Sequence, residues 1–142
     1  MKNLKDIIFE HFENSKFSIL ERLHITKDTA NREYNYHPKT KDKLKELVDK
    51  LIKERGNKAD LNDIDTSEIT NMSNLFNCSD FDGDISLWDV SNVGNMRGMF
   101  YDSRFTGKNG DISKWDVSNV KDMINMFDSC PLEKNPPKWY KK

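Results

Sequence analysis

The sequence predicts an α/β fold: a short solenoid in which parallel strands are backed by short helices, with an α-helical N-terminal region before it. Three observations predict this fold. Residues 84–93 return as residues 111–120 with one substitution, Leu87 against Lys114. Each copy is followed by two methionines and a phenylalanine in the same spacing, and a fainter copy occupies residues 61–76. Such repetition is typical of stacked proteins, since one unit cannot bury its own apolar face.

The repeat period follows from matched residues. Asp65 and Asp89 are 24 positions apart, whereas Asp89 and Asp116 are 27 positions apart. The three additional residues fall in the turn-rich segment 106–110, Thr-Gly-Lys-Asn-Gly. Insertions in repeat proteins map to loops, where extra length costs least.

The first part of each unit has the apolar spacing of a leucine-rich repeat. Ile85, Trp88 and Val90 fit the pattern L-x-x-L-x-L, and residues 61–66 and 112–117 have the same spacing. This pattern predicts a short strand whose alternate side chains face the core.

The second part of each unit changes period. Val93, Met96, Met99 and Phe100 are separated by three, three and one positions, which places them on one helical face. The Ser-Asn pair before them is typical of an N-cap. The methionines are expected to fill gaps in the core rather than to bind a cofactor. Each unit is therefore predicted to be a strand, a short helix and a loop, and the units stack.

Three regions are expected along the chain. Residues 1–38 form an N-terminal helical arm or cap, residues 39–131 the solenoid, and residues 132–142 a C-terminal tail. Within the solenoid, a degenerate first unit covers residues 39–60, and repeats begin near residues 61, 85 and 112. In the tail, Trp139 and Tyr140 either fold back over the last unit or anchor a neighbouring molecule.

Two helices are predicted before the repeats. Apolar residues within 3–13 share one face, so this segment is expected to cap the solenoid, or alternatively to dock a partner. Residues 14–36 have no clean period. Thr40 begins the clearest helix and Gly56 ends it. Tyr36 and His37 stand before Pro38, where a packed, hydrogen-bonded turn is expected rather than a ligand site.

Charge, cysteines and hydropathy limit the expected partners and location of the protein. Residues 1–58 carry 14 Lys/Arg and 10 Asp/Glu, a net charge of +4, and residues 59–142 carry 9 and 14, a net charge of −5. This asymmetry favours head-to-tail contact between copies more than nucleic-acid binding. Cys78 and Cys130 are expected to be buried free thiols in a reducing compartment rather than a disulfide. No signal peptide or membrane span is predicted, so synthesis in a host cytoplasm is expected.

Acidic residues are the main candidates for chemistry. Asp65, Asp89 and Asp116 recur at one place in successive units and would repel one another. Backbone amides of the following Ser-Asn turns are expected to offset the repulsion, and a bound cation or a basic partner is the alternative. Residues 80–84, Asp-Phe-Asp-Gly-Asp, resemble a calcium loop but lack its full spacing and its downstream glutamate, which favours a plain turn.

The sequence offers no constellation for catalysis. The three histidines precede the repeats and have no cysteine or carboxylate at metal-ligand spacing. No pair of nucleophile and base and no glycine-rich phosphate loop can be assembled. The lysines at positions 39, 41, 43 and 45 are interleaved with the acidic residues Asp42, Glu46 and Asp49. This mixture favours a solvated helix face over a phosphate site. The chain is therefore expected not to be an enzyme and to use no cofactor or metal.

The phrase Trp-Asp-Val-Ser-Asn-Val, followed by Met-x-x-Met-Phe, resembles the repeat of the BspA-like leucine-rich repeat proteins over about residues 59–131. The resemblance implies a non-enzymatic solenoid that binds other macromolecules, and many relatives are bacterial surface proteins. Short proteins with a block like residues 36–40 and an ending like residues 130–133 also resemble this chain, and they occur in gut bacteria and their phages.

These features lead to one hypothesis and one alternative. The hypothesis is a protein-binding structural component of a larger assembly, such as a capsid- or tail-associated part of a phage virion. The alternative is a bacterial surface adhesin or extracellular binding module. Expected partners are copies of the chain or other virion proteins, without nucleic acid or membrane. The expected interaction surface consists of Asp65, Asp89, Ser113, Lys114, Asp116, Trp139 and Tyr140.

Overall fold

The computed structural model describes residues 34–142, which form one compact unit. This part of the chain contains one α-helix, α4 (Lys41–Arg55), and one 3-10 helix, η1 (Pro131–Glu133). Strand pairing within it is limited to four isolated parallel bridges, so the described residues form no β-sheet. The predicted α/β solenoid of parallel strands and short helices is therefore wrong. The helix predicted at residues 3–13 lies outside the described residues.

β-Turns replace the predicted strands. The amide of Trp88 donates to the carbonyl of Ile85 (3.1 Å), and the amide of Trp115 donates to Ile112 (3.2 Å). A hydrogen bond between the first and fourth residues closes a β-turn, and here both of those residues are buried. The L-x-x-L spacing therefore marks turns, in which the chain changes direction too soon to form a strand.

Consecutive turns with left-handed residues replace the predicted repeat helices. In the second repeat, Met99 donates to Met96 (3.2 Å) and Tyr101 donates to Gly98 (3.1 Å). The φ angle is positive at Gly98 (60°) and at Asp102 (52°). A right-handed helix cannot pass through left-handed residues, so the helical bonding pattern does not propagate. The equivalent residues of the neighbouring repeats are also left-handed: Asn74, Cys78, Asn125 and Ser129.

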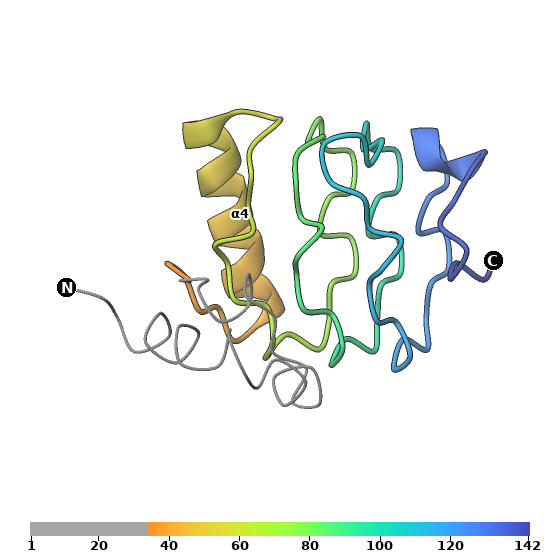
Figure 1. Ribbon diagram of the computed structural model, residues 1–142, viewed down its shortest axis with the longest axis horizontal. Helices are drawn as coiled ribbons and strands as arrows, with labels where there is room; N and C mark the ends of the chain where they lie inside the picture. The colour runs from red at the N-terminus through yellow and green to blue at the C-terminus, as the bar shows by residue number, and fades with distance from the viewer. Residues whose placement is uncertain (1–33) are drawn as a thin grey trace, which may run out of the picture. The chain divides into compact units, whose positions relative to one another are not determined.

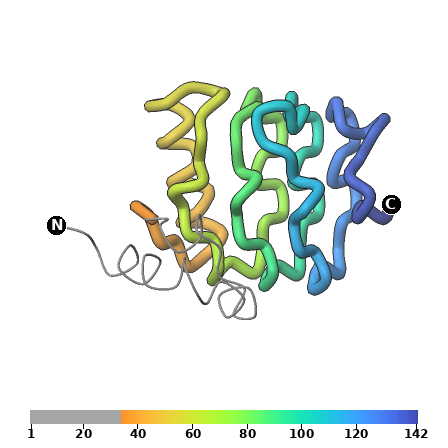
Figure 2. Tube along the Cα trace, in the orientation of Figure 1, coloured from red at the N-terminus to blue at the C-terminus, as the bar shows by residue number. Residues whose placement is uncertain are grey.

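In this part of the first two repeats, every second backbone amide donates a hydrogen bond to a carbonyl of the next repeat. In the first repeat, for example, the amide of Met72 donates across to the carbonyl of Asn95. Figures 1 and 2 show the result, in which successive coils of the chain lie side by side. The bonds between the first two repeats are Met72 to Asn95, Asn74 to Arg97, Phe76 to Met99 and Cys78 to Tyr101, at 2.8, 2.9, 2.8 and 2.9 Å.

A column of phenylalanine rings forms the centre of the core. Phe100 stacks on Phe76 and on Phe127 with centroid separations of 5.5 Å in both cases. The spacing is the same although the first pair is 24 residues apart and the second pair 27. The three additional residues of segment 106–110 therefore lie outside the column. The prediction that methionines fill the core is confirmed for the four that are fully buried: Met72, Met96, Met99 and Met126.

The predicted helix after residue 40 is confirmed as α4. Thr40 is its N-cap and accepts a hydrogen bond from the amide of Lys43 (3.2 Å). Gly56 ends the helix with a φ angle of 94°, a conformation that suits glycine. Leu44, Val48 and Leu51 are fully buried in the same core as the repeats, so α4 lies against the first repeat (Figure 1).

The C-terminal tail repeats a contact that the tryptophans of the second and third repeats make. The indole N–H of Trp88 donates to the carbonyl of Leu61 (2.9 Å), and that of Trp115 donates to Ile85 (3.3 Å). Trp139 makes the same bond to Ile112 (2.9 Å) and stacks on Trp115 with a centroid separation of 6.2 Å. The tail thus takes the place of a further repeat, and Trp139 folds back over the last unit.

Candidate functional site

The column of aspartates is held by its own turns. Asp65 accepts a hydrogen bond from the amide of Ser67 (3.0 Å), and the same bond recurs from Ser91 to Asp89 (3.0 Å) and from Ser118 to Asp116 (3.1 Å). The predicted bonds from local backbone amides are therefore present. Hydrogen bonds from the Ser118 side chain and backbone lower the pKa of Asp116, so it stays ionised at neutral pH. Among residues 34–142 no three His, Cys, Asp or Glu side chains lie close enough to hold a metal ion.

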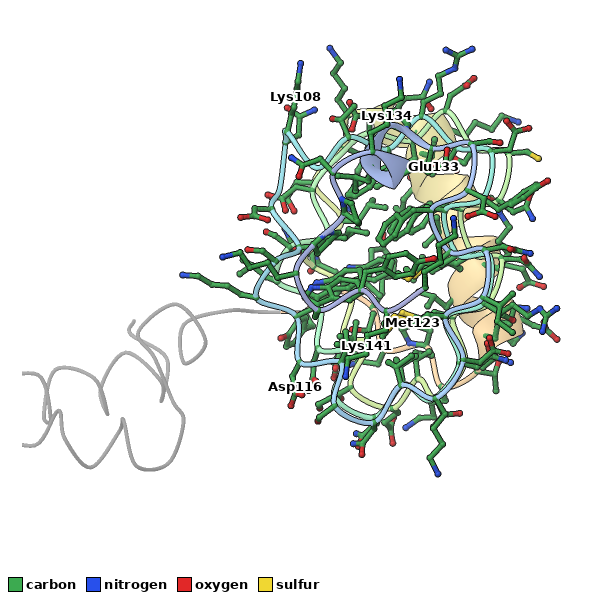
Figure 3. The ribbon with its side chains drawn as sticks, turned by 90° about the vertical axis from the view of Figure 1, so that its right-hand side faces the viewer. Lys108, Asp116, Met123, Glu133, Lys134 and Lys141 are labelled. Atoms are coloured by element: carbon green, nitrogen blue, oxygen red, sulfur yellow. The ribbon has the colours of Figure 1, made fainter. Side chains whose placement is uncertain are left out.

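The exposed side of the second and third repeats carries most of the predicted surface residues. We call it the turn face, defined by Leu87, Asp89, Ser113, Lys114 and Asp116, all of which are exposed. Leu87 is 53% exposed, and Lys114 occupies the equivalent position one repeat later. The backbone here is fixed, since Ser113 donates from both its amide and its hydroxyl to Asp111 (both 2.9 Å). Asp116 is labelled in Figure 3.

On the first repeat, the position that corresponds to the turn face is contacted by residues that precede the repeats. Asp65, half-buried, also contacts the imidazole of His37 (3.2 Å). Burial tends to raise the pKa of Asp65, but hydrogen bonds from Ser67 and His37 outweigh it and hold this pKa below its ordinary value. Tyr36 pairs with the first repeat through a parallel bridge to Ile64, so the segment around it is packed and hydrogen-bonded, as predicted. The structure therefore separates Asp65 from the open turn face.

Arg55, at the end of α4, makes a two-pronged ion pair with the first repeat. Its guanidinium donates to both carboxylate oxygens of Asp63, at 2.9 and 3.0 Å, and also to the carbonyl of Asp60 (3.0 Å). Asn35 donates to the same carboxylate at 2.8 Å. Bidentate arginine–carboxylate pairs combine charge with fixed geometry. This contact connects α4 to the first repeat, and neither residue was predicted from the sequence.

Acidification is expected to weaken the Arg55–Asp63 contact. The hydrogen bonds from Arg55 hold the pKa of Asp63 below its ordinary value. Because the pKa is lower in the folded state, the stabilisation is complete above about pH 4 and is lost as the pH falls through the folded-state value. Urea unfolding measured between about pH 6 and pH 2 should show the loss. Asp63→Asn should reduce this pH dependence, whereas Asp80→Asn, at an exposed carboxylate, should leave it unchanged. Equal pH profiles for both variants would contradict this assignment.

A groove crosses the three repeats at their left-handed corners. It has a volume of about 560 Å³, and its lining includes Cys78, Asp102, Arg104 and Cys130. Both cysteines are free, as predicted, but Cys78 is exposed and not buried. Desolvation and the nearby Asp102 raise the pKa of Cys78, and burial raises the pKa of Cys130. Raised thiol pKa values mean little thiolate at neutral pH, which does not favour a nucleophilic site.

The segment that resembles a calcium loop instead joins two repeats. The carboxylate of Asp82 accepts hydrogen bonds from the amide and the hydroxyl of Thr106, both at 2.8 Å. The side-chain amide of Asn109 donates to the Asp82 carbonyl (2.6 Å). Both donors come from the longer loop of the next repeat, so its additional residues bind back onto the neighbouring repeat.

The tail residues are placed differently from the rest of the predicted surface. Tyr140 packs edge-on against Phe127 with a centroid separation of 5.0 Å, and its hydroxyl is buried without a hydrogen-bond partner among the described residues. Trp139 and Tyr140 are both partly buried against the core. A sequence signal for this placement was present, because Trp115 and Trp139 are 24 positions apart, one repeat period.

The described fold and surfaces define a class: a repeat protein built of stacked β-turns, with a helix against its first repeat. The family model described as "Mycoplasma protein of unknown function, DUF285" matches residues 43–141. The chain belongs to this family, which is related to the BspA-like repeat proteins. No curated protein and no solved structure matches the chain. Within the described residues, no helix has the length and apolar character needed to cross a bilayer.

Proposed function

We propose that this chain is a non-enzymatic protein–protein interaction module that acts as a structural component of a larger assembly. The turn face carries the proposal. It places side chains of two successive repeats in matching positions, with Leu87 of one repeat equivalent to Lys114 of the next. Asp89 and Asp116 follow them by two positions, and each is fixed by a hydrogen bond from the backbone two residues later.

The physical argument concerns pre-organisation. Ordering a loop on binding costs conformational entropy, and a surface that is already ordered avoids much of that cost. The turns of this face are closed by backbone bonds, such as Trp115 to Ile112 (3.2 Å), and by the Asp-to-amide bonds. An exposed leucine in one repeat and a lysine at the equivalent position of the next, each followed by an exposed aspartate, fit a partner surface with an apolar contact and charges of both signs.

The setting is proposed from sequence resemblance. The Trp-Asp-Val-Ser-Asn-Val phrase and the family relation support repeats of the BspA-like kind. The similarity of residues 36–40 and 130–133 to short proteins that occur in gut bacteria and their phages is the ground for proposing a capsid- or tail-associated component of a virion. A bacterial surface binding module is the second candidate, because many BspA-like proteins lie on bacterial surfaces.

The test is the native mass of the protein, measured on extracts of the cells that produce it or of the particles that contain it. We expect the chain to elute from size exclusion within an assembly much heavier than its 16.7 kDa mass. The double variant Leu87→Asp/Lys114→Glu should shift it to the monomer position, with at least about a tenfold loss of affinity, since apolar and charged contacts are replaced together. Lys108→Glu, an exposed change in the 106–110 loop, is the matched control.

Thermal unfolding of the purified variants separates lost binding from lost folding. The turn-face side chains are exposed, so the melting temperature of the double variant should match that of the control. Wild-type protein found only as a free monomer would contradict the proposal. Wild-type protein found on the surface of intact cells, in place of particles, would favour the surface binding module.

A further inference from the structure

The inference begins with the hydrogen bonds that join the second repeat to the third. Every second amide of residues 96–102 donates to a carbonyl of residues 122–128, in the same register as between the first two repeats. The bonds are Met96 to Asp122, Gly98 to Ile124, Phe100 to Met126 and Asp102 to Asp128, at 2.8, 2.9, 2.9 and 2.9 Å.

The equivalent amides of the third repeat end this pattern. The amides of Met123, Asn125 and Phe127 have no hydrogen-bond partner among residues 34–142. The fourth, Ser129, donates to the carboxylate of Glu133 (3.2 Å) in η1, so the tail satisfies one donor of the four. We call the three unpaired donors the amide edge. Figure 3 looks onto this end of the described chain and labels Met123.

The side chains beside the amide edge are partly apolar. Ile124 is 51% exposed, Met123 is partly exposed, and Asn125 is exposed. The tail covers the other half of this end, where Trp139 stacks on Trp115 and Tyr140 packs against Phe127. This end therefore combines a row of unpaired backbone donors with exposed aliphatic surface, the two features used when an extended peptide adds to an exposed backbone edge.

Two intact copies of the described unit do not satisfy each other at this edge. Two amide edges placed face to face would present donors to donors. The complementary row of carbonyls belongs to the first repeat, against which α4 packs. There Lys41 donates to the hydroxyl of Ser73 (2.9 Å), and Leu44 and Val48 are fully buried. The acceptors must therefore come from a different segment.

We propose that the amide edge binds an extended peptide segment of a partner protein, one that offers backbone carbonyls at every second residue and an aliphatic side chain to cover Ile124. The interface between the second and third repeats is the template, because residues 122–128 bind to residues 96–102 in this manner. The site is separate from the turn face and does not depend on the proposed function. Unpaired backbone donors are costly wherever water is excluded, so a matching peptide gains from pairing them.

The probe is a synthetic peptide with the sequence of residues 121–130, Lys-Asp-Met-Ile-Asn-Met-Phe-Asp-Ser-Cys, with the cysteine replaced by serine. Amide hydrogen exchange of the full-length protein is followed by NMR. In the free protein, Met123, Asn125 and Phe127 are expected to exchange at least about a hundredfold faster than Met96, Gly98 and Phe100, whose amides are bonded. Saturating peptide should slow the three edge amides at least about tenfold, and a scrambled peptide should not.

Two matched variants locate the binding. Ile124→Asp should weaken peptide binding at least about tenfold while Met96, Gly98 and Phe100 keep their protection. Leu87→Asp, at a leucine of nearly equal exposure (53% against 51%), should leave peptide binding unchanged. The proposal is overturned if the three edge amides are already protected in the free protein. It is also overturned if the peptide slows none of them, or slows amides throughout the chain equally.

Discussion

Replacing Phe100 by alanine should lower the free energy of unfolding by about 3–5 kcal/mol, the range observed for large-to-small changes at fully buried phenylalanines. Phe100 is fully buried at the centre of the ring column, where it stacks on Phe76 and Phe127 at 5.5 Å and on Phe105 at 4.6 Å. Its removal would leave a cavity between two repeats, and the backbone bonds on both sides limit how far the repeats can close it.

The measurement is urea unfolding of the purified protein. Tyr101→Ala is the matched control, because this neighbouring aromatic residue is 40% exposed and its loss should cost far less, within about 1 kcal/mol. Equal losses for the two variants would show that the ring column does not hold the repeats together. If Phe100→Ala does not fold, Phe100→Leu should give a measurable intermediate loss.

Gly83→Ala is expected to have the second-largest effect. An added Cβ atom would lie 2.0 Å from the carbonyl oxygen of Ala59 and 2.6 Å from the ring of Phe81. The Ala59 carbonyl accepts the amide of Asp84 (2.9 Å), so moving it would break a contact between the repeats. Overpacking of this kind costs about 1–3 kcal/mol, and the backbone position of the clash places this change at the upper end.

Gly94→Ala is the control for the glycine substitution. Its nearest neighbours to an added Cβ are carbonyl oxygens at 3.8 and 4.0 Å, which is ordinary contact. The alanine restricts the unfolded chain and should stabilise the protein by about 0.4–1 kcal/mol. In thermal unfolding, the melting temperature should therefore fall for Gly83→Ala and rise for Gly94→Ala, relative to the wild type. A Gly83→Ala variant as stable as the wild type would show that the Ala59 backbone moves freely.

The sequence predicted which residues form the core better than it predicted their conformation. The repeat, the buried apolar positions and α4 could all be predicted. The strands and short helices could not, because the same spacing of three residues satisfies both a helix face and successive β-turns. A distinguishing signal exists at the left-handed positions, since Asn74, Gly98 and Asn125 are residue types that tolerate a positive φ angle.

The candidate site was predictable where it depends on local chemistry. An aspartate followed by serine can bind the amide two residues on, and this accounts for Asp89 and Asp116. The pairing of Arg55 with Asp63 depends on how α4 packs against the first repeat, and no local pattern encodes it. The amide edge likewise depends on knowing which amides bond between repeats, and that follows only from the turn conformation.

The equal spacing of the phenylalanine rings has an evolutionary consequence. The loop of the second repeat is three residues longer, yet the ring centroid of Phe100 lies 5.5 Å from that of Phe76 and 5.5 Å from that of Phe127. The surplus is held by bonds from Thr106 and Asn109 to Asp82. Mutation can therefore lengthen or rewrite this loop while selection on the interior continues unchanged. Such changes alter the surface of the repeat without altering the stack of rings that carries it.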